Sequence, residues 1–230
     1  MTPEMIDKLN ALITKIEKTR DDSAGVSAAE LIPQRPICED SLTNELVFSM
    51  LLWESSFDHA LKAVERIHEE LVDLNELRVC TPDELASILG VRMPRSSERA
   101  SRLIRVLNEI YSRENTLFLQ SLSEKTKREV QDYLESIDGL PSFAISRVIL
   151  LALNWHAFPL DERLAKLLAA KDIVTQSSSL GQQGAELERG VRASDALRTY
   201  THIEHWAHSQ RSTSRARNST GRKSTKGASS

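Results

Sequence analysis

The residue in this sequence best suited to chemistry is Asp161, which lies eighteen positions after Phe143. A carboxylate in a cleft can stabilise positive charge that develops on a substrate, because the cleft keeps bulk water from weakening the interaction. The same residue follows Pro159 and Leu160 and precedes Glu162, a pattern typical of a helix N-cap. Capping and catalysis are geometrically compatible, so both roles stay open.

A second candidate is the turn around Gly139, between two segments with helical periodicity. Glycine readily takes left-handed backbone conformations, and exposed amides in such a turn form a nest for one phosphate group. Pro141 follows in the same turn and has no N–H to offer, so one such contact is weakened or lost. A packed corner between two helices is the ordinary alternative.

Together, residues 137–143 and 158–161 resemble the signature of the helix-hairpin-helix DNA glycosylases, the endonuclease III superfamily. That family places an apolar-Pro-Gly-apolar-Gly hairpin between two helices, a Lys or a substitute just inside the second helix, and an Asp after a short apolar turn. Asp161 matches the Asp. Phe143 stands where the Lys would be, and Pro141 stands where the second Gly would be.

The resemblance implies base-excision chemistry on a flipped nucleotide. It places Asp161 against the deoxyribose, where a negative charge stabilises oxocarbenium character at C1′ and orients an attacking water. It places Phe143 in the base pocket, where an aromatic face contributes about 1–3 kcal/mol per stacked base; packing in the core is the alternative. A phenyl ring cannot be a nucleophile, which excludes lyase chemistry through a Schiff base. The first interpretation is therefore a monofunctional DNA N-glycosylase.

The resemblance covers about Leu42 to Asp172 and adds candidate DNA contacts. Residues 44–52 resemble the first core helix of the family, and Trp53 after them is a candidate for the base pocket. The candidate contacts to the DNA backbone are Gly139, Leu140 and Ser142 in the hairpin, and Arg99 and Arg102 in a basic stretch. The alternatives are a Trp packed in the core and arginines on a solvated helix surface. Glu54, beside Trp53, would place an anion toward the DNA.

No metal or cofactor is expected. In endonuclease III an iron–sulfur loop with four cysteines follows a late helix, but Ser, Thr and Arg follow residues 202–211, which resemble that helix. The chain has only Cys38 and Cys80, too few for such a cluster. His202 and His205 share a helix face, but a pair without a clearly placed third ligand more often lies on a solvated surface.

Helical periodicity is dense and strand alternation is almost absent, which predicts an all-α protein of about nine or ten helices. The resemblance implies a two-lobed fold without an iron–sulfur loop. Thr81 begins the most clearly marked helix, with Pro82 at the first position and Glu84 three residues after the cap. Four parts are predicted: an N-terminal helix and loop (1–40), a barrel-like helical lobe (41–172) with the helix-hairpin-helix at about 127–154, C-terminal helices that pack with the N-terminal segment (173–210), and a disordered basic tail (211–230).

The charge distribution bounds the strength of DNA binding. Six of the 30 basic residues lie in residues 211–230, which contain no acidic residue. The rest of the chain therefore has 24 basic and 33 acidic residues, a net charge of −9. Because phosphate neutralisation supplies most non-specific affinity for a duplex, this acidic body counts against strong binding, and the tail is expected to supply part of the affinity.

The expected partner is double-stranded DNA, damaged or mismatched, bound by a monomer. No apolar run approaches the length of a membrane span and the first residues do not form an export signal, so the expected location is the cytoplasm, at the nucleoid. The alternative interpretation is a catalytically inactive helix-hairpin-helix protein that binds nucleic acid or only keeps the fold. Pro141, Phe143, Glu54 and the acidic body favour this alternative. An Asp161 that opens into a cavity would favour the enzyme, and a sealed Asp161 would favour the inactive protein.

Overall fold

Every regular element of the computed structural model is helical, which confirms the all-α class for the described backbone, residues 1–20 and 28–221. Side chains are described for residues 1–19 and 30–210. The α-helices are α1 (Pro3–Arg20), α2 (Ser41–Leu52), α3 (Phe57–Glu70), α4 (Leu74–Val79), α5 (Pro82–Leu89), α6 (Ser96–Glu114), α7 (Lys127–Glu135), α8 (Ser142–Arg147), α9 (Glu162–Ala169), α10 (Leu180–Gly190) and α11 (Ala196–Gly221). Short 3-10 segments η1 (Ala28–Leu31), η2 (Gln120–Glu124) and η4 (Ala193–Asp195) and one π-helical segment η3 (Val148–Ala152) complete the set.

The described residues contain eleven α-helices, close to the expected nine or ten. Helix α10 begins inside a Ser/Gln/Gly-rich segment. Ser179 caps α10 in a reciprocal capping box with Gln182, and this local bonding offsets the poor helix propensity of its glycines. The predicted start at Thr81 is confirmed, with the capping box to Glu84 in place.

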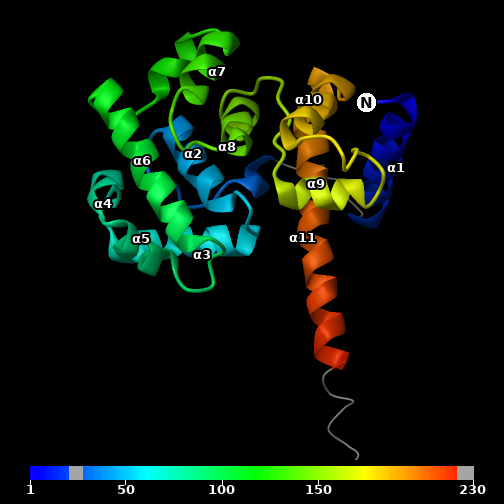
Figure 1. Cartoon of the computed structure of the whole chain (residues 1–230), viewed down its shortest axis with the longest axis horizontal. Coiled ribbons are helices and arrows are strands. Elements are labelled where there is room, and N and C mark those ends of the chain that lie inside the picture. Colours follow the sequence, from blue (N-terminus) through cyan, green and yellow to red (C-terminus); the bar gives the residue numbers. More distant parts are fainter. Residues whose placement is uncertain (21–27, 222–230) are drawn as a thin grey trace, which may run out of the picture.

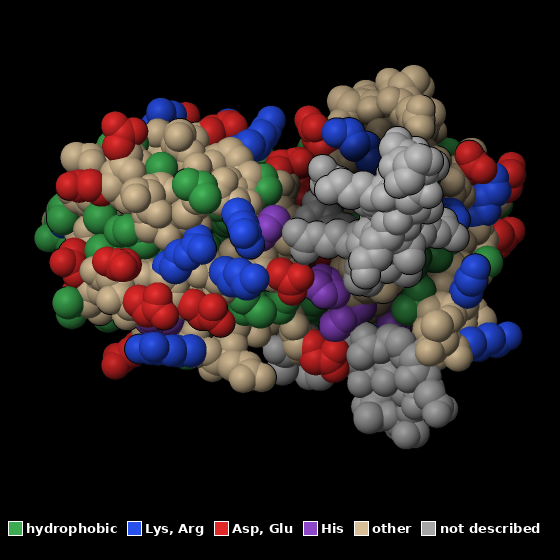
Figure 2. All heavy atoms as spheres, turned by 90° about the horizontal axis from the view of Figure 1, so that it is seen from below, with side chains coloured by type: hydrophobic (Ala, Val, Ile, Leu, Met, Phe, Trp, Pro, Cys, Tyr) green, Lys and Arg blue, Asp and Glu red, His purple; other side chains and the backbone are tan. Residues whose placement is uncertain are grey.

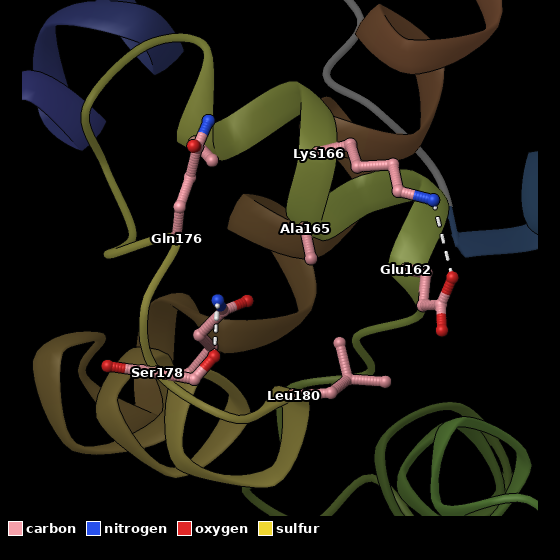
Figure 3. A pocket seen from close by; sticks show the side chains of 8 residues that line it. Glu162, Ala165, Lys166, Gln176, Ser178 and Leu180 are labelled. Carbon is pink, nitrogen blue, oxygen red and sulfur yellow. Dashed lines mark hydrogen bonds and ion pairs between the residues drawn. The ribbon is translucent and has the colours of Figure 1, made fainter.

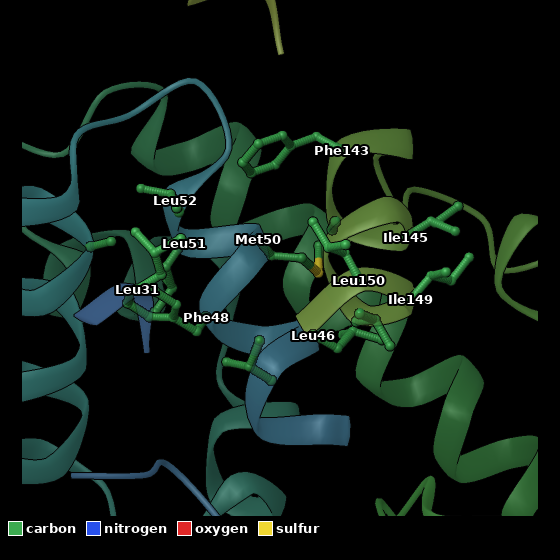
Figure 4. Close-up of a cluster of buried hydrophobic side chains, with 14 of the residues drawn as sticks. Leu31, Leu46, Phe48, Met50, Leu51, Leu52, Phe143, Ile145, Ile149 and Leu150 are labelled. Carbon is green, nitrogen blue, oxygen red and sulfur yellow. The ribbon is translucent and has the colours of Figure 1, made fainter. Parts of the chain in front are cut away.

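Helix α2 is the centre of the core. All eleven residues from Leu42 to Leu52 are buried, so the helix is covered on every side rather than along one stripe. It contacts α3, α6, α8 and η3, and Figure 4 shows Met50 and Leu46 facing the segment that follows α8. This surrounding layer fixes the direction in which the end of α2 at Leu52 points.

The helices form two groups. Helices α2 to α8 surround the core just described, and α1, α9, α10 and α11 form a second group beside it (Figure 1). The first helix packs against the last, α1 on α11, and α11 also contacts α9 and η3. Residues 211–221, expected to be disordered, continue α11 as helix, while residues 222–230 lie outside the described residues. No helix in the described chain is both long enough and apolar enough to span a lipid bilayer.

The expected hairpin joins α7 to α8. Gly139 has φ +85°, in the left-handed region, and the Leu140 N–H donates to the Ile137 carbonyl at 3.3 Å. Pro141 is the N-cap residue of α8, so its missing N–H falls where no intrahelical partner exists. Gly139 therefore allows the chain to reverse direction, and Pro141 leads into α8 without the loss of a helical hydrogen bond.

We predict that Gly139→Ala lowers the free energy of unfolding by about 1–2 kcal/mol, because an L side chain is strained at this positive φ. Urea denaturation followed by circular dichroism measures the change. Gly181→Ala is the matched control, since Gly181 lies in helix α10 with open space around it and alanine there should stabilise by up to about 1 kcal/mol. Equal changes in the free energy of unfolding for the two substitutions would contradict the positive φ of Gly139.

Candidate active site

Asp161 is the N-cap residue of α9 and is fully buried, with 0% of its surface exposed. Its Oδ1 accepts from the Leu164 N–H at 2.8 Å, and its Oδ2 accepts from the Glu54 N–H at 3.1 Å. The Arg163 Nε lies 3.5 Å from Oδ2. Burial raises the pKa of Asp161 above its ordinary value, although Arg163 and the two N–H groups act in the opposite direction.

The turn after α2 covers Asp161. Glu54 in this turn has φ +52°, a left-handed conformation that costs a residue other than glycine free energy. Its carboxylate Oε1 accepts from the Glu162 N–H at 2.8 Å, at the N-terminus of α9. Burial, and then the neighbouring Asp161, raise the pKa of Glu54. The backbone and side chain of Glu54 thus join the end of α2 to the start of α9.

Phe143 lies in the hydrophobic core. It is 1% exposed, and Figure 4 shows its ring among the buried side chains near the end of α2. A ring with so little exposed surface offers no open face to an extruded base. The residue that the resemblance places in a base pocket is a core residue here.

Arg99 is buried, not at the surface where a DNA contact requires it. Only 1% of it is exposed, and its guanidinium donates to the carbonyls of Met50, Trp53 (2.6 Å) and Pro94 (3.2 Å). Burial lowers its pKa to about 10. Arg99 therefore caps the carbonyl end of α2 and holds the turn at Trp53, which argues against the expected role as a phosphate ligand.

Trp53 is partly exposed and stands among arginines. The guanidinium carbon of Arg102 lies 4.9 Å from its ring centroid, and that of Arg95 lies 5.3 Å away. Both arginines also pair with Glu98, at 3.0 and 3.6 Å. The result is a cation–π cluster whose positive charge is partly neutralised.

A groove of about 390 Å³ lies between α6 and the hairpin, lined by Glu98, Ser101, Arg102, Arg105, Asp138, Gly139 and Leu140. Arg102 donates to the Gly139 carbonyl at 3.3 Å, and Arg105 pairs with Asp138 at 2.9 Å. Ser142 is exposed at the start of α8. The structure thus brings Gly139, Leu140 and Arg102 together and adds Arg105, whereas Ser142 does not line this groove.

Another cavity, of about 490 Å³, opens beside α9 and is lined by Glu162, Ala165 and Lys166 on one wall. Figure 3 shows Gln176, Ser178 and Leu180 across from them. Asp161 does not line this cavity, although α9 begins with Glu162 directly after it. The cavity therefore gives no access to the carboxylate.

Sequence reasoning missed a set of buried ionic residues behind Asp161. Arg163 donates to both carboxylate oxygens of Glu204, at 2.8 and 2.9 Å. Tyr200 donates to Glu204 at 3.1 Å and accepts from Arg147 at 2.8 Å. The Nε of Arg147 donates to Glu45 at 2.9 Å.

A signal for two of these residues was present in the sequence. Glu45 and Arg147 are charged residues inside otherwise apolar helical runs, and both are almost completely buried, at 3% and 0% exposure. Charged residues at such positions are rarely buried unless they are paired. Nothing local in the sequence shows that their partners include Tyr200.

The two histidines have separate carboxylate neighbours. His202 Nε2 lies 3.2 Å from Glu17, and His205 Nε2 lies 2.9 Å from Glu30. Within the described residues no group of three or more His, Cys, Asp or Glu side chains is arranged to hold a metal ion.

The structure is similar to solved DNA glycosylases. It matches endonuclease III trapped in a covalent intermediate with DNA, with a TM-score of 0.62 and 12% identity over 86% of this chain and 84% of that chain. It matches the Helicobacter pylori 3-methyladenine DNA glycosylase MagIII bound to 1,N6-ethenoadenine, with 0.58 and 14% over 90% and 98%. It also matches the Clostridium acetobutylicum 8-oxoguanine glycosylase/lyase in complex with double-stranded DNA, with 0.61 and 16% over 90% and 70%. Neither a protein-family model nor a curated protein matches the amino-acid sequence. The likeness shows that this chain has the helix-hairpin-helix glycosylase fold.

We predict that the stability difference between the native protein and Asp161→Asn falls as the pH rises. The folded-state pKa of Asp161 is raised, so its contribution to stability is complete below its ordinary pKa and is lost as the pH rises through the folded value. Asparagine cannot ionise and shows no such loss. Urea unfolding at several pH values between 4 and 7 measures the difference. A stability difference between the native protein and Asp161→Asn that grows with pH would contradict the burial of Asp161.

Proposed function

We propose that this chain, which folds like the helix-hairpin-helix DNA glycosylases, binds duplex DNA with its hairpin face and does not hydrolyse N-glycosidic bonds. The observation that supports this most is the complete burial of Asp161. A carboxylate that stabilises an oxocarbenium ion must approach the sugar directly. Here both oxygens face protein groups, and Glu54 covers the approach.

The proposed DNA contacts lie around the groove between α6 and the hairpin. Arg102 and Arg105 flank Gly139 there, and Trp53 with Arg95 extends the same face. Glu98 and Asp138 neutralise part of this charge. The face seen from below in Figure 2 is a different one, and there too acidic and basic side chains are intermixed. Weak, salt-sensitive binding is therefore expected, with phosphates replacing the two carboxylates as partners of the arginines.

We predict that replacing both Arg102 and Arg105 with alanine weakens duplex binding and reduces the slope of log K against log salt by about two, since each lost phosphate contact removes about 0.9. Fluorescence anisotropy with a labelled duplex at several salt concentrations measures the slope. The matched control replaces the exposed Arg189 and Arg192, near the other end of the chain and away from the groove. Equal loss in both double variants would show that binding does not depend on the groove.

We predict no base release from duplexes that contain uracil, alkylated purines, oxidised purines or mismatches. Alkaline or abasic-endonuclease cleavage followed by gel electrophoresis measures the product. Native protein and Asp161→Asn should be indistinguishable, because the carboxylate does not reach a substrate. Product formed by the native protein and lost in Asp161→Asn would overturn the proposal.

Monofunctional N-glycosylase activity is the second candidate. The observation that favours it is the backbone of Glu54, which lies over Asp161 with a strained φ of +52°, because strain of this kind favours a rearrangement of the turn. Glu54→Gly removes the carboxylate and its bond to the Glu162 N–H, so the turn is no longer tied to α9 by a side chain, while glycine suits this φ. Base release by this variant that disappears when Asp161→Asn is added would support the second candidate.

A further inference from the structure

Asp161 is one end of a buried polar chain that crosses the protein. The chain runs from Asp161 to Arg163 on α9, to Glu204 and Tyr200 on α11, to Arg147 at the end of α8, and to Glu45 on α2. Its members are almost completely buried, with Arg163 the most accessible at 10% side-chain exposure. Elements far apart in the sequence thus meet through charged groups inside the molecule.

The chain contains more acids than bases. Asp161, Glu204 and Glu45 are carboxyl groups, while Arg163 and Arg147 are the two cations, so full ionisation would leave one uncompensated negative charge in the interior. An uncompensated buried charge is costly, so the acids compete for the two cations. The charge on any one acid therefore depends on the others.

Arg163 interacts more strongly with Glu204 than with Asp161. It receives two hydrogen bonds from the Arg163 guanidinium and one from Tyr200, and its pKa is lowered by Arg163 and Arg147 despite burial. Asp161 has only an ion-pair contact with Arg163 at 3.5 Å. Arg163 is thus held mainly by α11 and turned only partly toward Asp161.

The other groups that act on Asp161 come from different elements. Glu54, in the turn after α2, donates its N–H to the carboxylate but also carries a negative charge close to it. Glu162, the next residue, is exposed and pairs with Lys166. Arg99 on α6 lies near enough for its charge and that of Asp161 to influence each other. Arg163 is the only one of these that forms a salt bridge to Asp161 within the described residues.

We propose that Arg163 and Glu204 are positioning residues that set the charge of the Asp161 carboxyl from the interior. Helix α11 then governs the candidate site from the side away from the hairpin groove. Glu204 withdraws Arg163 from Asp161, which keeps Asp161 poorly compensated and disfavours its ionised form. The inference rests on the proposed function, in which Asp161 is an enclosed carboxyl group, and adds the residues that govern its ionisation.

The test is the titration of Asp161 in the full chain, followed by carboxyl carbon-13 NMR and assigned by the signal that is lost in Asp161→Asn. Arg163→Gln should move the pKa of Asp161 further up, because a stabilising cation is removed. Glu204→Gln should move it down, because a repelling anion is removed and Arg163 is freed to approach. Arg163→Lys should restore much of the native value, and Arg189→Gln, at an exposed position, should leave it unchanged.

A merely structural role predicts a different pattern. General loosening would admit water and move the pKa of Asp161 down toward its ordinary value in both the Arg163→Gln and the Glu204→Gln variants. A downward or absent shift in Arg163→Gln would therefore overturn the inference. If Arg163→Gln does not fold, Glu204→Gln is read together with hydrogen exchange of the Leu164 amide, which donates to Asp161. A lowered pKa of Asp161 with unchanged amide protection supports the inference, whereas an unchanged pKa, or a lowered pKa with lost protection, would overturn it.

The outcome is independent of the excision assay. A protein that released bases and showed these opposite shifts would contradict the proposed function and leave the inference standing. A protein without excision activity, in which neither Arg163→Gln nor Glu204→Gln changed the pKa of Asp161, would contradict the inference and leave the proposed function standing.

Discussion

The burial of two guanidinium groups constrains the whole structure. Arg147 and Arg163 are removed from water, and such ions are tolerated only where charged partners and hydrogen bonds replace their hydration. Arg147 meets this requirement with Glu45, Tyr200 and the Leu31 carbonyl, which come from three distant segments. Because removing one partner of a buried pair costs about 3–5 kcal/mol, a large share of a typical domain's stability of about 5–15 kcal/mol, the two helix groups are held in one arrangement.

Within this arrangement Asp161 has a structural role that does not depend on catalysis. Its carboxylate caps α9 and accepts from the turn after α2, so it joins the two helix groups at one point. A fold shared with DNA glycosylases is therefore compatible with a carboxylate that serves only to hold the lobes together. An Asp at position 161 suits both a catalytic role and a structural role as the cap of α9. The presence of this Asp in the sequence therefore does not distinguish the two roles.

Local bonding explains how much of the fold could be predicted. The capping box at Thr81 and the glycine turn at Gly139 depend on residues a few positions apart, and both are as predicted. Helix α10 is harder to predict, because its glycines disfavour a helix and only the capping box at Ser179 marks its start. The burial of Arg99 could also be predicted from the sequence. Arg99 lies four residues before Leu103 and therefore lies on the same side of α6, the side that packs against the core.

The state of Asp161 could not be predicted in this way. Glu54, which covers it, is 107 residues away in the sequence, and Glu204, which holds Arg163, is 41 residues beyond Arg163. Such contacts depend on how the helix groups meet, and no periodicity or spacing reports that geometry. The candidate site was therefore located by pattern, while its accessibility emerged only from the packing of distant segments.

The contact between α1 and α11 has a consequence for biosynthesis. Leu9, Leu12 and Ile16 of α1 are buried, but the helix that packs against α1 begins only at Ala196. During translation the apolar stripe of α1 therefore lacks the helix that covers it until the residues of α11 have been made. Transiently exposed apolar surface of this kind favours aggregation and chaperone binding. The nascent protein is thus most vulnerable at α1, which is made long before the helix that covers it.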